Sequence, residues 1–437
     1  MSRKHIVRVT AAAAVAMMAG GALAACSPGS TDGVVEISYV VQSDATSVAG
    51  AERVIDAFNS THEDIRVVLN SQPAGGEGDN LVKTKLATGE MDDIFNNPTG
   101  SLMHALNPDE TLVDLSGEDW MQYVTDDFIS TASTDKGVYG APQGTSLAGG
   151  VLYNIPLYEE LGLEIPTSWD EFIANNEAIK AAKPDVAPVL QAFGDTWTSQ
   201  LIVLASYAAV QQEDPTWAES YTANEAKFAD EPALEGFEHQ QDLFDRGLLN
   251  KDFSTMTNGE AQTAVATGTG AHYPMLTNAI GGVLQNTPDN VDDVGYFAMP
   301  ADDAQYTAAT IWQPNALFIP KSTTGPELEA AKTFIGWLMT SEEACTISQE
   351  SAIPSGPYVI STCELAGDVP RVVKDVEPYF ESGKTAPALE FLSPIKGPNL
   401  ENLTVEAGSG IKSAKEAAAA YDEDVKKQAQ QLGLDGW

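Results

Sequence analysis

The chain has 437 residues, with 63 Asp or Glu against 23 Lys or Arg, and a formal net charge of −40. A surface this acidic repels nucleic acid and anionic lipid, so both are excluded as binding partners of the domain itself. The length suits two ordinary domains, and beyond the first residues no stretch is long and apolar enough to span a bilayer.

Residues 1–25 are predicted to be a secretion signal. Arg3, Lys4 and Arg8 precede an Ala-rich apolar stretch that is too short to span a membrane. The stretch ends at Leu23-Ala24-Ala25-Cys26, which resembles the lipobox of bacterial lipoproteins. The resemblance implies a diacylglyceryl group on Cys26 and a tether over residues 26–33. The alternative is a plain secretory signal with a coincidental cysteine.

Polar residues follow the first and third predicted strands, at 34–41 and 91–95. In open α/β sheets, ligand groups come from loops at the carboxyl ends of strands, and neutral donors and acceptors suit hydroxyl-rich ligands. The candidate ligand contacts here are Gln42, Asp44, Asn97 and Ser101. Turn chemistry and a helix N-cap are the alternatives for the last two. The Gly-rich segment 74–79 lacks a Lys and is predicted to be a surface loop before a helix at 80–88.

The stretch 139–179 has the most specific pattern. Its loop, Tyr139-Gly140-Ala141-Pro142, leads to an apolar strand ending at Tyr153-Asn154. Gly162 is expected to end a short helix, and Thr167 or Ser168 to cap the next one, which begins Trp169-Asp170-Glu171-Phe172. In order and spacing these motifs resemble the bacterial family 1 extracellular solute-binding proteins, the ligand-capturing subunits of sugar ABC importers. The alternative is an ordinary strand–helix unit.

The resemblance covers essentially the whole mature chain and implies its architecture. It implies an α/β, two-lobed, periplasmic-binding-protein-like fold of type II with three inter-lobe crossings. The first lobe is expected to comprise residues 34–143 plus 311–352. The second is expected to comprise residues 144–310 plus 353–437.

Aromatic side chains are the candidate contacts in the second half of the chain. Trp197 follows a predicted strand at 189–193, and a sugar buries its one apolar face on such a ring. A core role is the alternative. Family members often have Trp where His272 or Tyr273 falls here, and Tyr273 is taken as the contact. The resemblance further implies that Trp312, Gln313 and Asn315 face the cleft.

The mature chain keeps two further cysteines, Cys345 and Cys363. Outside the cell an isolated pair favours a disulfide. Two separate free thiols are the alternative.

No pattern of a catalytic or metal site stands out. The histidines occur singly, and paired carboxylates are expected by chance in so acidic a chain. We therefore expect no enzyme, no cofactor and no metal. The expected protein is a monomer, anchored by lipid alone on the extracellular face of the cell membrane. It captures a sugar, with an oligosaccharide expected, and delivers it to the permease subunits of an ABC transporter. A binding protein for a non-sugar solute and a surface glycan hydrolase stay open as alternatives.

Overall fold

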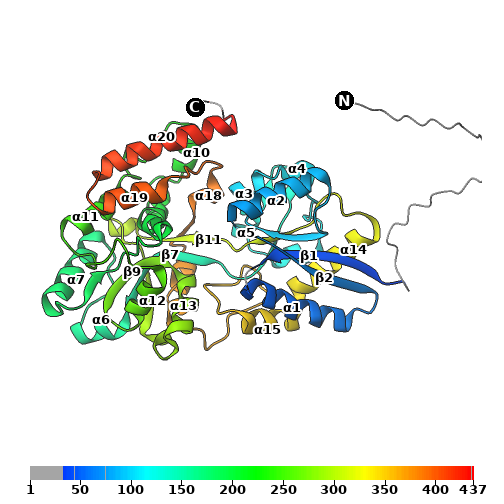
Figure 1. Ribbon diagram of the computed structural model, residues 1–437, viewed down its shortest axis with the longest axis horizontal. Helices are drawn as coiled ribbons and strands as arrows, with labels where there is room; N and C mark the ends of the chain where they lie inside the picture. The colour runs from blue at the N-terminus through cyan, green and yellow to red at the C-terminus, as the bar shows by residue number, and fades with distance from the viewer. Residues whose placement is uncertain (1–32, 44, 74, 435) are drawn as a thin grey trace, which may run out of the picture.

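A computed structural model describes residues 33–43, 45–73, 75–434 and 436–437 (Figure 1). The signal, the tether, Cys26 and Asp44 lie outside the described residues. The described chain forms two α/β lobes, each built on its own sheet (Figure 1). None of the helices in this part of the chain is long and apolar enough to cross a membrane.

The first lobe is built on a five-stranded sheet of order β2-β1-β3-β12-β6. Its strands are β1 (Val35–Gln42), β2 (Ile65–Gln72), β3 (Ile94–Asn97), β6 (Ala141–Pro142) and β12 (Ala316–Phe318). β1 runs parallel to β2 and β3, whereas β12 runs antiparallel to β3 and β6. The chain therefore returns from the second lobe to complete this sheet.

Helices lie on both sides of the first sheet (Figure 1). They are α1 (Ala45–Thr61), α2 (Gly75–Thr88), α3 (Ser101–His104), α4 (Pro108–Thr111), η1 (Asp119–Tyr123), α5 (Asp126–Thr131), α14 (Gly325–Thr340) and α15 (Glu342–Ser351), with a hairpin of β4 (Ser133–Thr134) and β5 (Gly137–Val138). Phe58 of α1 meets Phe334 of α14 edge to face at 4.9 Å between ring centroids. Such aromatic pairs add to the energy of burial in this core.

The prediction of a surface loop at 74–79 is wrong, because α2 already begins at Gly75. Glycine is a poor helix former. Val82 of the same helix is, however, buried in the core of the first lobe. Burial of an apolar helix face supplies most helical stability in proteins, so tertiary packing outweighs the local propensity here.

The second lobe is built on a six-stranded sheet of order β13-β11-β7-β9-β8, in which β10 also pairs with β7. Its strands are β7 (Leu147–Asn154), β8 (Ala187–Val189), β9 (Gly270–Leu276), β10 (Val294–Ala298), β11 (Ala309–Trp312) and β13 (Thr385–Pro387). β7 is central and is buried from its second residue onwards. A strand covered on both faces reads as a continuous apolar run, which is the pattern the sequence shows there.

The helices of the second lobe surround this sheet (Figure 1). They are α6 (Ile155–Leu161), α7 (Trp169–Ala182), η2 (Thr196–Gln200), α8 (Leu201–Ala205), α9 (Tyr207–Glu213), α10 (Trp217–Thr222), α11 (Glu235–Asp245), α12 (Asn258–Ala266), η3 (Thr277–Ala279), α13 (Ile280–Asn286), η4 (Pro288–Asp293), η5 (Ala304–Tyr306), α16 (Arg371–Lys374), α17 (Glu377–Glu381), α18 (Leu389–Leu392), α19 (Leu400–Gly408) and α20 (Ala414–Leu432). Two predicted helix boundaries are confirmed: Gly162 ends α6 with φ 63°, and the Ser168 side chain accepts a hydrogen bond from the Glu171 N–H.

Three segments connect the lobes, and they lie side by side. The first is 143–146, where Gln143 N–H donates to the Asn315 carbonyl at 2.9 Å. On its other side, Ser146 N–H donates to the Pro357 carbonyl at 3.0 Å. The first crossing is thus hydrogen-bonded to the second crossing at Asn315 and to Pro357, which lies in the segment before the third crossing.

Two of the expected lobe boundaries differ from the structure. The expected first lobe begins again at 311, but Ile311 lies in β11 of the second sheet. The expected second lobe begins again at 353, but Val359 packs in the core of the first lobe, and its carbonyl accepts a hydrogen bond from Thr125 N–H at 2.9 Å. A disulfide joins Cys363 to Cys345 of α15 and holds the same segment to the first lobe. Backbone pairing and this covalent bond, rather than local sequence, set these boundaries.

Removing the disulfide should destabilise the first lobe. The bond closes a loop with a sequence separation of 18. In the chain-entropy model this is worth about 3 kcal/mol. We expect the double substitution Cys345→Ala, Cys363→Ala to lower the free energy of unfolding by that amount in urea denaturation, and reduced wild-type protein to match it. Equal stability of reduced and oxidised wild type would contradict the prediction.

Candidate functional site

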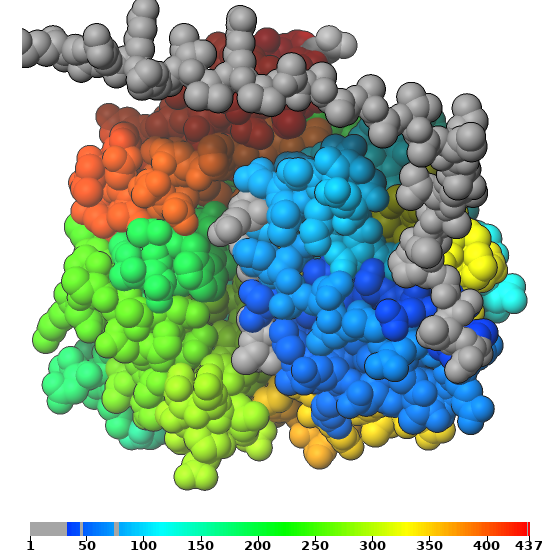
Figure 2. Space-filling view, turned by 45° about the vertical axis from the view of Figure 1, so that its right-hand side comes forward, coloured from blue at the N-terminus to red at the C-terminus, as the bar shows by residue number. Residues whose placement is uncertain are grey.

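A cavity of about 600 Å³ opens where the lobes meet. It lies against the ends of β1, β3 and β6 and the start of β12, which share one edge of the first sheet because β12 is antiparallel. Ligand sites in open α/β sheets occur at this carboxyl edge. Figure 2 shows the groove between the first lobe, in blue, and the second lobe, in green.

The described residues that line the cavity are uncharged. Among the described residues, no Asp, Glu, Lys, Arg or His borders it, although charged residues make up 20% of the chain. Its amide side chains are Gln42, Asn96, Gln143, Asn278, Gln313 and Asn315. Tyr358 also lines it, and burial raises the pKa of this phenol, which therefore stays neutral. A charged ligand would lose its hydration here without gaining a counter-charge.

Hydrogen bonds orient the amides on the first-lobe side. Asn315 Nδ2 donates to Asn96 Oδ1 at 2.9 Å, and Asn96 Nδ2 donates to Gln143 Oε1. Gln143 Nε2 in turn donates to the Tyr39 hydroxyl at 2.8 Å. Each primary amide has two donor hydrogens and an oxygen with two lone pairs, so this chain leaves hydrogen-bonding capacity unused. The cavity floor therefore presents fixed, neutral donors and acceptors.

Gln313 is the residue of the lining that most clearly lacks a partner. Its side chain is 8% exposed, and its Oε1 atom is buried without a hydrogen bond. Leaving a buried acceptor unpaired costs about 1–3 kcal/mol. Gln313 therefore contributes to the cavity lining an amide whose oxygen has no partner among the described residues.

The rest of the lining is mostly apolar. Val41, Val54, Leu338 and Met339 contribute to it, together with the Cys345–Cys363 disulfide. A few placed polar groups on an otherwise apolar wall are usual for small-molecule sites.

The structure places the predicted contacts of the first lobe in different surroundings. Gln42 and Asn315 border the cavity, whereas Ser101 begins α3 outside the lining. Asn97 is 5% exposed and does not line the cavity, whereas its neighbour Asn96 does. Successive side chains of a strand point to opposite faces. The predicted contact at Asn97 is therefore displaced by one residue from the side chain that faces the cavity.

The aromatic candidates also lie in different surroundings, and those described here do not line the cavity. Tyr273 is 1% exposed in the core of the second lobe, and its hydroxyl donates to Asn258 Oδ1 at 2.8 Å, so its predicted cleft contact is wrong. Trp197 is 39% exposed on η2 but does not line the cavity. His272 is fully buried and lies 2.6 Å from the Tyr158 hydroxyl. Burial lowers the pKa of His272 to about 3, which is consistent with a structural role.

Trp312 borders a second, much smaller hollow of about 20 Å³, next to Leu389. Its ring lies over Gly149, where an added Cβ atom would come within 2.6 Å of the ring. Only glycine allows this close approach. The lobes also touch near this hollow, since a Cβ on Gly100 would come within 2.7 Å of Phe391 of α18.

Of the lining amides and the phenol, four were not predicted as contacts from the sequence: Asn96, Gln143, Asn278 and Tyr358. Asn278 lies two residues after the end of β9, so the rule of carboxyl ends could have found it. Asn96 and Asn97 differ only in which face of β3 they occupy, and the strand is apolar towards both faces. Tyr358 has no sequence signal, because only the pairing of its segment with the first crossing, at Thr145, brings it to the cavity.

Comparison with known proteins agrees with this architecture. The family described as bacterial extracellular solute-binding protein matches residues 42–344. The Multiple sugar-binding protein of Streptococcus mutans serotype c (strain ATCC 700610 / UA159) is 24% identical over 286 residues, which are 64% of this chain and 66% of that protein. The match thus spans just under two thirds of that relative.

Solved structures show the same fold. A chitin oligosaccharide binding protein superposes with a TM-score of 0.73 and 22% identity, over 91% of this chain and 99% of the other. SBP RafE in complex with raffinose superposes with a TM-score of 0.72 and 20% identity, over 91% of this chain and all 100% of the other. The fold is the two-lobed, type II fold of periplasmic binding proteins.

The one-residue difference between Asn96 and Asn97 can be tested by matched substitutions. Asn96→Ala should weaken binding of the solute about tenfold, because it removes a cavity amide and the partner of Gln143 and Asn315. Asn97→Ala should leave affinity unchanged and cost about 1 kcal/mol of stability, because the side chain is buried. Calorimetric titration and thermal unfolding measure the two effects. The reverse pattern would place Asn97 in the site.

Proposed function

The chain belongs to the bacterial extracellular solute-binding proteins, and we propose that its solute is an uncharged sugar, specifically an oligosaccharide, bound between the lobes. The observation that carries this proposal is the described lining of the cavity, which is uncharged and rich in amides, Gln313 among them. Sugar hydroxyls both donate and accept hydrogen bonds, which matches the amides. The relatives named for multiple sugars, chitin oligosaccharide and raffinose support an oligosaccharide.

Binding requires no covalent step. The cavity is bordered by the first lobe and also by Leu147 and Asn278 of the second. A ligand that contacts both lobes stabilises the closed arrangement more than an open one, so it shifts the population towards closure. The crossing segments, which also form part of the cavity lining, are the place where such a motion must be absorbed.

The other two functions fit the cavity less well. A cationic solute needs carboxylates around it, and a sugar phosphate needs Lys or Arg; the described lining has neither. A glycan hydrolase needs two carboxyl groups on either side of the bond, about 5–10 Å apart. The cavity described here supplies no such pair.

Delivery and anchoring complete the proposal. The protein acts as a monomer on the extracellular face of the membrane, held by lipid on Cys26, and hands the sugar to the permease subunits of an ABC importer. The lipobox-like Leu23-Ala24-Ala25-Cys26 supports the anchor. Membership of the family supports the proposed delivery of the sugar to an ABC importer.

A thermal-shift screen tests the proposed ligand class. The purified protein is heated with neutral mono- and oligosaccharides, amino acids, polyamines and sugar phosphates. A ligand at 100 times its Kd should add about 2.7 kcal/mol to the stability of the folded state. We expect shifts with neutral oligosaccharides alone. Shifts only with a charged solute would overturn the proposal that the ligand is a sugar. Release of reducing ends from a bound oligosaccharide would favour the alternative of a glycan hydrolase.

Gln313 should affect stability and binding in opposite directions. Gln313→Leu removes the unpaired acceptor, so we expect the unliganded protein to gain up to about 1–3 kcal/mol while affinity for the sugar falls about tenfold. Gln240→Leu is the matched control, because Gln240 Oε1 is also buried and unpaired but lies outside the cavity. It should raise stability without changing affinity. Equal affinity losses in both variants would argue against contact through Gln313.

The anchor is tested in cells. Cys26→Ala should prevent lipidation and release the protein into the medium, because no other acyl site remains. Fractionation and immunoblotting of membrane and medium measure the release. Membrane retention of the variant would show that something other than the Cys26 lipid holds the protein.

A further inference from the structure

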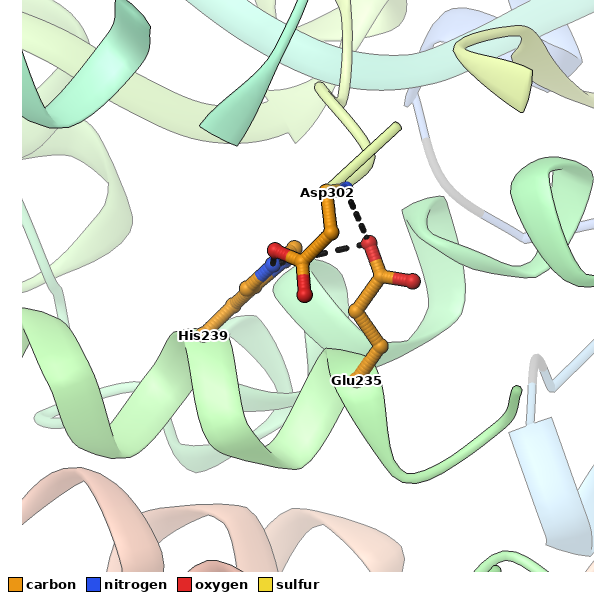
Figure 3. A group of neighbouring side chains, drawn as sticks. All are labelled: Glu235, His239 and Asp302. Atoms are coloured by element: carbon orange, nitrogen blue, oxygen red, sulfur yellow. Dashed lines mark hydrogen bonds and ion pairs between the residues drawn. The ribbon is translucent and has the colours of Figure 1, made fainter. Parts of the chain in front are cut away.

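Three side chains of types that can ligate a metal meet in the second lobe: Glu235, His239 and Asp302. None of them lines the cavity. Glu235 and His239 rise from the same side of α11, and Asp302 reaches them from the loop after β10 (Figure 3). The spacing of four residues places the two helical side chains one turn apart. The third residue is 63 positions away from His239 in the chain.

The ligand atoms of the three residues lie within 4.8 Å of one another, and the two separations from His239 suit a small cation. His239 Nε2 lies 3.0 Å from Asp302 Oδ1 and 3.5 Å from Glu235 Oε1. Four ligands placed tetrahedrally about 2.0–2.1 Å from zinc are separated from one another by about 3.3 Å. The two observed separations bracket that value. An ion bound between Nε2 and Oδ1 would replace the direct contact of His239 with Asp302.

His239 is held in this orientation before any ion arrives. Its side chain is 3% exposed, and its ring stacks on Trp169 with 3.7 Å between centroids and 7° between planes. Trp169 is fixed in turn, because its Nε1–H donates to Asp242 Oδ2 at 3.1 Å. Glu235 Oε1 also accepts a hydrogen bond from the Asp302 backbone N–H at 2.6 Å, which orients that carboxylate. Little rotamer freedom remains to be lost on binding.

The charges around the cluster favour a cation. Glu235 and Asp302 lie close enough to Glu231 for the three carboxylates to repel one another when ionised, and Glu238 adds to the repulsion on Glu231. His239 counters this repulsion only when it is protonated. A divalent ion would offset it at any pH at which these carboxylates are ionised.

We propose that Glu235, His239 and Asp302 bind a zinc ion. Imidazole with two carboxylates suits zinc, whereas calcium and magnesium prefer oxygen ligands alone. Asp302 is 69% exposed, so water can complete the coordination from the solvent side. The buried Nδ1 of His239 has no hydrogen-bond partner, and an ion on Nε2 places the ring proton there. Since zinc-bound histidines usually donate from that nitrogen, we expect weaker binding than at a closed structural site.

The proposal is independent of the sugar site and is tested by zinc binding. The purified protein is stripped with chelator, dialysed against zinc chloride, and analysed for bound metal by mass spectrometry and by calorimetric titration. We expect one zinc per chain. Asp302→Asn and Glu235→Gln should each weaken zinc binding at least about tenfold, since substitution of residues that only hydrogen-bond to metal ligands already costs that much.

Matched controls separate a built site from general attraction to an acidic surface. Asp303→Asn and Glu238→Gln each remove one negative charge close to the cluster, as the ligand substitutions do, but leave the three ligands in place. Both variants should keep zinc binding. His239→Gln should abolish it, with circular dichroism verifying the fold because this side chain is buried. No stoichiometric zinc, equal losses in the control variants, or calcium binding in place of zinc would overturn the proposal and leave the cluster as an ion pair.

Discussion

The hydrogen bonds between the crossing segments are the constraint on which the rest of the structure depends. Gln143 N–H bonds to the Asn315 carbonyl, and Ser146 N–H bonds to the Pro357 carbonyl, so the first crossing is fixed to the second crossing and to the segment that leads to the third. The same segments supply Gln143, Gln313 and Asn315 to the cavity. The connection between the lobes and the ligand site are therefore one structural unit, and any movement of one lobe changes the cavity itself.

The electrostatics of the cavity differ from those of the chain as a whole. The chain has a net charge of −40, yet the described lining contains no ionisable group except Tyr358, whose pKa is raised by burial. Acidic groups in water cost little, whereas an unpaired charge in a partly buried site costs several kcal/mol. Amides avoid that cost and still offer directional hydrogen bonds. The acidic surface thus favours solubility, whereas the neutral lining of the cavity favours an uncharged ligand.

Local sequence patterns succeeded where one short segment decides the outcome. The helix end at Gly162, the cap at Ser168 and the strand through Val151-Leu152-Tyr153 all follow from neighbouring residues. The pair Cys345 and Cys363 followed from composition alone. Patterns failed where burial overrode propensity, as in α2. They also failed where one residue of strand register separates a buried amide, Asn97, from one that faces the cavity, Asn96.

From the sequence alone, the resemblance of the motifs to those of the family implied the two-lobed α/β class, while periodicity and caps predicted individual elements, because those are properties of short segments. Of the predicted contacts, Gln42 and Asn315 border the cavity, and their contact with a ligand stays a prediction. Only the tertiary structure decided that Tyr273 is core, that Val359 belongs with the first lobe, and that Asp302 meets Glu235 and His239. Each of these depends on contacts between residues far apart in the chain, and such contacts are set by packing and strand pairing rather than by neighbours in sequence.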